Sequence, residues 1–467
     1  MCLAGIGGSL RRSPLPSPHC RQPWQAEVDC ACPGQDSRLC ERTRARPGTG
    51  ADEPTASCHH DQTGTANWGD GVSSRPKIAL LCSGLGNIRR GHEVFARDLY
   101  VLLKHQLDIT LFKGGGAACE GELVLDHIPR NAASLNHIHS PASPKWRAAD
   151  LEQERLRVEG ETFAYAALRP LLDGGFDVIH CLEREVCTVL YSNRHLFSKT
   201  PRYLWSNGGA LPAADQPPCD FVQEHSAHNL SKNRQDKAFL IPHGVDMQRF
   251  HPGVESHYRA RHGIPADAFV AISVGSICYW HKRMDHVIRE VAAVPGAWLV
   301  IVGQSTADTL AIRQLGQQLM ANRIVFDSMP HDELPQAYAA ADVFVLGSLF
   351  ETFGIVYIEA MAMGLPVICT NHPNQRAIVQ QALFIDMRRA GELTGALRDT
   401  PREQLRELGQ SGLRVADQTY DLAVLRQQYL EQYARMASEP VTLARVGIGR
   451  RLRSHAASLT RSLRGLA

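Results

Sequence analysis

The stretch DVFVLGSLFETFGIVYIEAMAMGLPVICT, residues 342–370, contains a complete strand–helix–strand unit. Its apolar start, Asp342 to Ser348, predicts a buried strand that leads into a loop at its carboxyl end. A helix is expected from about Phe353 to Met363, because Gly364 suits a left-handed helix end and Pro366 prevents continuation. The apolar run LPVICT then predicts the next strand. This order of elements indicates an α/β fold with a parallel sheet.

The same alternation continues upstream of this unit and predicts one doubly wound domain over residues 244–420. Punctuated by Pro242, Gly244 and Pro252, the segment IPHGVDMQRFHPG is typical of a connector that precedes such a domain. The expected strands are residues 269–276, 298–304 and 323–328, and the expected helices are residues 284–294, 309–321 and 333–341.

A first domain of the same kind is expected over residues 76–243. KIALLCSG, from Lys77, predicts a strand; the loop GLGNIRRG, a helix in HEVFARDLYVLLKH and a strand in LDITLFKG follow it. FDVIHC and PRYLW predict further strands, and residues 421–437 predict a closing helix. The alternation therefore predicts two doubly wound, Rossmann-like domains.

Two glutamates flank the helix predicted in the opening stretch. Gly354 lies at its start, where unpaired N–H groups and the positive end of the helix dipole favour an anion. Glu351 precedes the helix and Glu359 lies within it, and eight helical residues rise about 12 Å. Carboxylates accept hydroxyl hydrogen bonds strongly, so this spacing suits a nucleotide sugar, with the sugar at one carboxylate and the ribose at the other.

At these residues the sequence resembles the retaining glycosyltransferase family 4 of the GT-B fold, which implies that the two Rossmann-like domains face each other across a cleft. The matching features are the Glu351-x7-Glu359 pair, the triplet Phe353-Gly354-Ile355 and the run EAMAMGLPVI. IPHGVDMQRFHP, LPQAYAAADVFVLGS, and VGS…HKRMDHVI followed by WLVIVG also match family segments. The resemblance covers about residues 77–436.

The resemblance implies a role for each matching residue of the second domain. Glu359 would bind the donor ribose, Glu351 would face the transferred sugar, and Lys282 would neutralise the diphosphate in place of a metal ion. No metal ion and no cofactor beyond the nucleotide-sugar co-substrate is expected. The remaining donor-binding residues implied here are Phe353, Gly354, Ile355, Gly275, Ser276 and Arg283.

In the first domain, the resemblance implies a donor-sugar contact for His180 and a place beside the phosphates for Gly91. One departure is that Ser276 stands where the family usually has arginine. Lys282, Arg283, Arg89 or Arg90 could supply that missing cation. Each assignment has an alternative: His180 as a core histidine, Gly91 as a helix cap, and the charged residues as solvated surface. His225 and His228 are expected to be structural.

The implied activity is transfer of a sugar, with retention, to an unidentified glycan, lipid or protein hydroxyl. Same-face attack is favoured over a double displacement through a carboxylate. Three alternatives remain: a catalytically impaired sugar-nucleotide-binding protein, a phosphorylase, and a nucleotide-dependent oxidoreductase or epimerase. The last is disfavoured because Gly84 and Gly86 lack the third glycine of a G-x-G-x-x-G motif.

Composition narrows the class of protein. The chain has 467 residues, of which 44% are hydrophobic and 21% charged, and its net charge is +2. These values are typical of a globular protein and give no reason to expect a nucleic-acid partner. No apolar run is long enough to span a bilayer, and the N-terminus lacks the apolar region of a secretory signal. A cytoplasmic location is therefore expected.

The two ends of the chain differ from the middle. Residues 1–75 are rich in Pro, Gly, Ser and Arg, contain six of the 13 cysteines, and are predicted to be a disordered extension. Residues 440–467 contain six arginines and no acidic residue, with leucines at helical spacing. This tail predicts either peripheral contact with the inner face of an anionic membrane or an ordinary terminal helix. The seven later cysteines mostly lie in apolar contexts and are expected to be buried.

Overall fold

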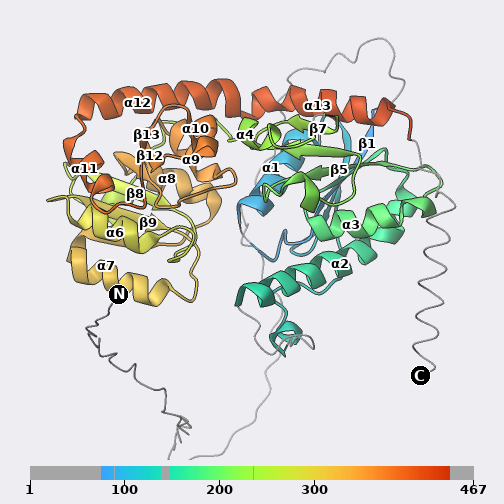
Figure 1. Ribbon diagram of the computed structural model, residues 1–467, viewed down its shortest axis with the longest axis horizontal. Helices are drawn as coiled ribbons and strands as arrows, with labels where there is room; N and C mark the ends of the chain where they lie inside the picture. Colours follow the sequence, from blue (N-terminus) through green and yellow to red (C-terminus); the bar gives the residue numbers. More distant parts are fainter. Residues whose placement is uncertain (1–74, 89, 138–147, 235, 442–467) are drawn as a thin grey trace, which may run out of the picture. The chain divides into compact units, whose positions relative to one another are not determined.

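The computed structural model describes residues 75–88, 90–137, 148–234 and 236–441 (Figure 1). Two parallel sheets with helices on their faces confirm the predicted α/β class. Residues 1–74 of the predicted extension, Arg89, and residues 442–467 of the predicted tail lie outside the described residues.

The first sheet has the strand order β3-β2-β1-β4-β5-β6-β7, with all neighbouring strands parallel. The order reverses between β1 and β4, and ligands of such sheets bind at the carboxyl ends of the strands next to this reversal. The strands are β1 (Lys77–Cys82), β2 (Asp108–Lys113), β3 (Glu122–Val124), β4 (Val178–Cys181), β5 (Arg202–Ser206), β6 (Phe221–Glu224) and β7 (Ala238–Leu240).

Helices cover both faces of the first sheet because side chains alternate across each strand. Leu80 packs with α1 (Gly91–Leu103) and α13 (Leu422–Ser438) in one apolar cluster. Its neighbour Leu81 packs on the other face, in a cluster with α2 (Ala148–Gly174) and α3 (Arg184–Ser192). The helix expected at residues 421–437 is thus α13, which completes the core of the first domain (Figure 1).

The second sheet repeats the pattern with the order β10-β9-β8-β11-β12-β13, again all parallel. Here the reversal lies between β8 and β11, which places the loops after these two strands at the ligand-binding edge. The strands are β8 (Val270–Val274), β9 (Trp298–Val302), β10 (Ile324–Asp327), β11 (Val343–Val345), β12 (Val367–Thr370) and β13 (Leu383–Ile385).

The helices of the second domain again form two layers, each with its own apolar cluster. On one face lie α6 (Met284–Ala292), α7 (Thr309–Met320) and α11 (Glu392–Asp399). The other face carries α8 (Leu334–Ala339) and α9 (Ile355–Ala362), and α12 (Arg402–Val415) packs against α9. Three short helices complete the described chain: α4 (Ala227–Leu230), α5 (Tyr258–Arg261) and α10 (Pro373–Val379).

The chain passes between the sheets at two places that lie side by side. Val245, in the predicted connector, donates its N–H to Tyr420 O at 2.8 Å, and its own carbonyl accepts from Leu422 N at 3.1 Å. A Cβ on Gly244 would lie 2.5 Å from Leu422 Cδ2, so a larger residue here would have to displace the Leu422 side chain. The connector and the start of α13 therefore form one joint.

Two further sequence expectations meet the structure here. Six of the seven described cysteines are buried as expected, whereas Cys119 is exposed. None of the helices in the described ranges has the length and apolar character needed to span a bilayer.

Candidate active site

Helix α9 is the centre of the predicted site, and two glycines set its limits. The N-cap residue Gly354 has φ +82°, and a Cβ there would lie 2.7 Å from Tyr357 Cδ2. Gly364, just past the C-terminal end, has φ +72°, as expected for a left-handed helix stop. The helix expected from Phe353 to Met363 therefore exists, two residues shorter at the start and one shorter at the end.

Glu351 lies in the loop before α9 and is 4% exposed. Its Oε1 accepts hydrogen bonds from Lys282 Nζ and Ser348 Oγ, each at 2.6 Å. Its backbone carbonyl accepts from Asn374 Nδ2 at 2.7 Å and from Gln375 Nε2 at 2.8 Å. The start of α10 thus fixes the loop, and a lysine compensates the buried carboxylate.

Lys282 reaches Glu351 from the loop after β8, across the glycine that the sequence singled out. Gly275 has φ +147°, and a Cβ on it would lie 2.9 Å from Lys282 Cε. Any larger residue would displace the lysine. Lys282 and Glu351, predicted to act on neighbouring parts of the donor, are therefore in direct contact, and their roles stay predictions.

Ser276 and Arg283, the other two predicted donor-binding residues of this loop, differ in their surroundings. Arg283 has φ +48°, and its guanidinium donates to the backbone carbonyls of Gly347 and Met387. It therefore stabilises the edge of the sheet, and a donor contact would have to use its remaining N–H groups. Ser276 makes no side-chain hydrogen bond to another residue in the described ranges.

Glu359 lies inside α9 and is 3% exposed. Its Oε1 lies 2.6 Å from His331 Nε2, and its Oε2 accepts from Tyr338 OH at 2.9 Å. Burial lowers the pKa of His331, but the hydrogen bond with Glu359 and the charge of Glu359 outweigh it and leave this pKa above its ordinary value. Sequence reasoning missed His331, although the position shortly after an apolar strand was a usable signal.

The first domain meets this site at the start of α1. A Cβ on Gly91, the first residue of α1, would lie 3.4 Å from Ile355 Cδ1, the first residue of α9. Two residues predicted separately are thus brought together, with two helix N-termini beside each other. The side chain of Phe353 packs in the core against His243 and Tyr420. Only the backbone of Phe353 could therefore contact a ligand.

The match to a family model covers residues 254–402 and carries the description Glycosyl transferases group 1. The matched residues lie within the second domain, which is therefore similar to the group 1 glycosyl transferases. The D-inositol 3-phosphate glycosyltransferase of Mycobacteroides abscessus is 36% identical over 149 residues, which are 31% of this chain and 33% of that relative. The same enzyme of Mycolicibacterium smegmatis is 32% identical over 149 residues, also 33% of its length. The matched segment thus spans about a third of these curated relatives.

Solved structures resemble the described chain beyond the group 1 domain. Sucrose-phosphate synthase from Thermosynechococcus elongatus has a TM-score of 0.64 at 20% identity, over 78% of this chain and 99% of that one. HepE from Anabaena, solved in complex with UDP and glucose, has a TM-score of 0.60 at 16% identity, over 77% of this chain and 100% of that one. At these identities the similarity shows the fold, and the chain has the GT-B fold.

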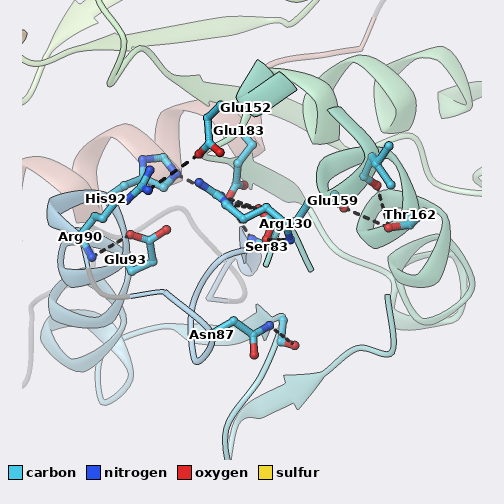
Figure 2. Close-up of polar contacts among 12 residues, drawn as sticks. Ser83, Asn87, Arg90, His92, Glu93, Arg130, Glu152, Glu159, Thr162 and Glu183 are labelled. Atoms are coloured by element: carbon cyan, nitrogen blue, oxygen red, sulfur yellow. Dashed lines mark hydrogen bonds and ion pairs between the residues drawn. The ribbon is translucent and has the colours of Figure 1, made fainter. Parts of the chain in front are cut away.

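A cluster of charged residues that sequence reasoning missed lies beyond the group 1 domain, at the carboxyl ends of β1 and β4 (Figure 2). Glu183 Oε1 accepts from Ser83 N at 2.8 Å and from Ser83 Oγ at 3.0 Å, and lies 3.5 Å from His92 Nε2. Burial raises the pKa of Glu183, but the bonds with His92 and Ser83 outweigh it and leave this pKa lowered. Glu183 is therefore an anion beside the start of α1.

Arg130 occupies the middle of the same cluster (Figure 2). Its Nε donates to Glu159 Oε2 at 2.7 Å, and its backbone N–H donates to Glu159 Oε1 at 3.0 Å. Glu93 accepts from the backbone N–H of Arg90 at 3.1 Å, which caps α1. The exposed side chain of Arg90 lies 3.8 Å from Glu152, so this candidate for the missing cation is held by a surface ion pair.

Cys82, His92 and Glu183 are close enough to be considered as metal ligands, since their ligand atoms lie within 4.8 Å of one another. A metal needs the thiolate form of cysteine. Burial and the charges of Glu183 and Glu93 raise the pKa of Cys82 well above its ordinary value, which keeps it a thiol. The donor set therefore fits a metal ion poorly.

His180 lies in the core of the first domain. It is 0% exposed; its Nδ1 lies 2.7 Å from Tyr433 OH and its Nε2 lies 2.7 Å from Ser206 Oγ. Burial lowers the pKa of His180 to about 3. With both ring nitrogens occupied, the geometry favours the core-histidine alternative over a sugar contact. His225 is likewise buried and stacks on His243, with the two ring centroids 3.9 Å apart, as expected for a structural residue.

Proposed function

We propose that the protein is a retaining glycosyltransferase that moves a sugar from a nucleoside-diphosphate sugar to an acceptor hydroxyl without a metal ion. The observation that carries this proposal is the pair of buried carboxylates in and just before α9. Glu351 is paired with Lys282 and Glu359 with His331, in a domain that matches the group 1 model. The GT-B neighbours solved with UDP and glucose, or with UDP-2-fluoro glucose, support a nucleotide-sugar donor.

The geometry suggests how the donor would lie. The ribose would donate its two hydroxyls to Glu359, and the diphosphate would lie at the N-terminus of α9, where N–H groups and the helix dipole favour an anion. The sugar would then reach Glu351 in the loop before α9. Gly91 and Ile355 bring the α1 N-terminus to the same place, so an acceptor could approach from the first domain.

Transfer would proceed by charge stabilisation. As the bond to the leaving diphosphate breaks, the Lys282 ammonium and the α9 N-terminus would stabilise the negative charge that develops there. Glu351 would stabilise the positive character of the sugar. In a same-face attack, the acceptor hydroxyl would pass its proton to the departing phosphate oxygen. The Lys282–Glu351 contact of 2.6 Å places the two opposite charges next to each other before donor binds.

Calorimetric titration of UDP, GDP and ADP, and then of their sugars, tests the proposal. One nucleoside diphosphate should bind, and its sugar derivative should release that diphosphate faster when a mixture of glycan and lipid acceptors is added. Retention is checked by the anomeric configuration of the product. If none of the three nucleotides binds the folded protein, the proposal is wrong.

Ser276, in the position of the family's arginine, favours one alternative function, that of a sugar-nucleotide-binding protein without catalysis. A sugar-nucleotide-binding protein would bind the donor as tightly but would release no diphosphate with any acceptor. The Ser276→Arg variant separates the two: it should turn on release in a binding protein, whereas an active enzyme already shows turnover without it.

A further inference from the structure

We propose that His331 is a positioning residue of the nucleotide site, which fixes the Glu359 carboxylate so that both of its oxygens face the ribose diol. This inference rests on the proposed function. It adds a residue from the β10–α8 loop to a site otherwise built from α9 and the loops after β8 and β11.

The hydrogen bonds on Glu359 are arranged for a diol. His331 Nε2 lies 2.6 Å from Oε1, and Tyr338 OH donates to Oε2 at 2.9 Å. A carboxylate oxygen has two lone-pair sites, so each oxygen keeps one for a ligand. Two neighbouring hydroxyls are the donors that match one free site on each oxygen. A 2′-deoxyribose would leave one of them empty.

His331 is the charge partner of the buried Glu359 carboxylate. A carboxylate that is 3% exposed is costly to ionise without a cation. Among the described residues, His331 is the cationic side chain within ion-pair distance of Glu359. A neutral residue at position 331 would leave the buried Glu359 carboxylate without this charged partner and would weaken the hold on its Oε1.

Charged groups from three other elements surround His331 and hold it in place. Asp332, the next residue, accepts from Arg249 NH1 at 2.9 Å, and Arg249 NH2 lies 3.5 Å from Asp98 of α1. Glu359 and Asp98 raise the pKa of His331, while burial and the charge of Arg249 lower it, with a net rise. The Phe250 ring packs 5.3 Å from the imidazole. The bond to Glu359 and the packing of the Phe250 ring therefore position the imidazole beside α9, with a quarter of its side chain exposed.

The test is calorimetric titration of wild type and His331→Gln with the nucleoside diphosphate that binds, and with its 2′-deoxy form, between pH 5.5 and 8.5. Glutamine can still donate a hydrogen bond to Glu359 but carries no charge. At pH 5.5 the variant should bind roughly tenfold more weakly, as expected for loss of a charge-assisted bond. As pH rises through the pKa of His331, the wild type should weaken toward the variant. The ratio of the two affinities cancels the titration of the ligand itself.

Two further measurements keep the result interpretable. His262→Gln is a matched control, because His262 Nε2 lies 3.5 Å from Asp327 with a similar exposure, and this change should leave the ratio at one. The preference of wild type for the ribose form should be roughly tenfold and should shrink in His331→Gln. A ratio that stays constant across the pH range overturns the inference while leaving the proposed function intact. Failure of wild type to bind any nucleotide overturns the proposed function instead.

Discussion

The loop before α9 and the middle of α9 each carry a buried glutamate, and the two glutamates have different electrostatic surroundings. Glu351 is held by a lysine and a serine hydroxyl, and Glu359 by a histidine and a tyrosine hydroxyl. A lysine ammonium is a fixed charge near neutral pH, whereas an imidazole titrates there. The comparison teaches that the partner of one carboxylate keeps its charge at physiological pH, while the partner of the other can change its charge there. This difference suits a sugar that gains charge during transfer and a ribose that does not.

The largest effect is expected for Lys282→Ala. The change leaves Glu351 without its cation and removes the charge proposed to stabilise the leaving diphosphate, so turnover should fall by roughly 10²- to 10³-fold. Steady-state release of nucleoside diphosphate measures it, with a thermal melt to show that the variant is folded. Lys282→Arg, which keeps the charge, should recover part of the loss. Turnover of a folded Lys282→Ala protein within a few-fold of wild type would contradict the assignment.

Exchanging each glutamate for glutamine sharpens the comparison directly. Glu359→Gln should weaken binding of the free nucleoside diphosphate by about 10- to 100-fold, because the ribose belongs to that ligand. Glu351→Gln should leave this affinity nearly unchanged and lower turnover by about as much, since its interaction strengthens as the sugar becomes positive. Calorimetry on both variants needs no acceptor. Equal weakening in both, or weakening in Glu351→Gln alone, would show that the donor does not lie along α9 as proposed.

The fold of the second domain was predictable because its signals are local. Strand β9 is wholly apolar, β8 is apolar apart from Ser273, and Gly364 marks the end of α9. The prediction missed α2, which is 27 residues long, contains Pro170 and is too polar to show a clear apolar face. Strands of three residues, such as β3 and β13, are too short to leave a period in the sequence.

In the candidate site, too, residues that lie close together in the sequence were predictable, and residues that only the fold brings together were not. Glu351, Glu359 and Gly354 lie within one short segment, so their relation was visible in the sequence. His331 lies 28 positions from Glu359, and only the parallel sheet brings the β10 loop beside α9. The surroundings of His180 were equally hidden, because Tyr433, which covers it, is 253 positions away. Local sequence shows that a polar residue ends a strand but not what the rest of the chain places over it.

A smaller effect is expected on the pH dependence of the free energy of unfolding, to which histidines with lowered and with raised pKa contribute in opposite directions. His180 and His225 are buried, and burial lowers the pKa of each to about 3. Below pH 6.5 these two histidines bind protons in the unfolded chain but stay neutral in the folded protein. Each histidine should therefore lower the free energy of unfolding by about 1.4 kcal/mol per pH unit on acidification. The pKa of His331 is raised, so its contribution is fully present below the unfolded pKa and is lost as pH rises through the folded pKa.

Denaturant unfolding between pH 7.5 and 5 checks both signs. His180→Gln can keep hydrogen bonds to Ser206 and Tyr433, and its stability should fall less steeply with acid than that of wild type. His331→Gln should show the opposite change, a steeper fall, because wild type gains stability from His331 at low pH. Parallel stability curves for wild type and His180→Gln would mean that His180 is protonated in the fold.

The smallest effect is expected where the two domains touch, at Gly91. This glycine and Gly275 were both predicted to lie at the donor, but the space around them differs. A Cβ on Gly275 would need a left-handed backbone and would lie 2.9 Å from Lys282 Cε, so Gly275→Ala should disturb the Lys282–Glu351 pair and lower turnover nearly as much as Lys282→Ala.

A Cβ on Gly91 would meet only the tip of Ile355, at 3.4 Å, and α1 gains from an alanine in its first turn. Gly91→Ala should therefore change stability by about 0.5 kcal/mol or less and turnover by about threefold at most. A larger loss of turnover with unchanged nucleoside diphosphate affinity would show that the ligand itself, rather than Ile355, needs the space beside Gly91.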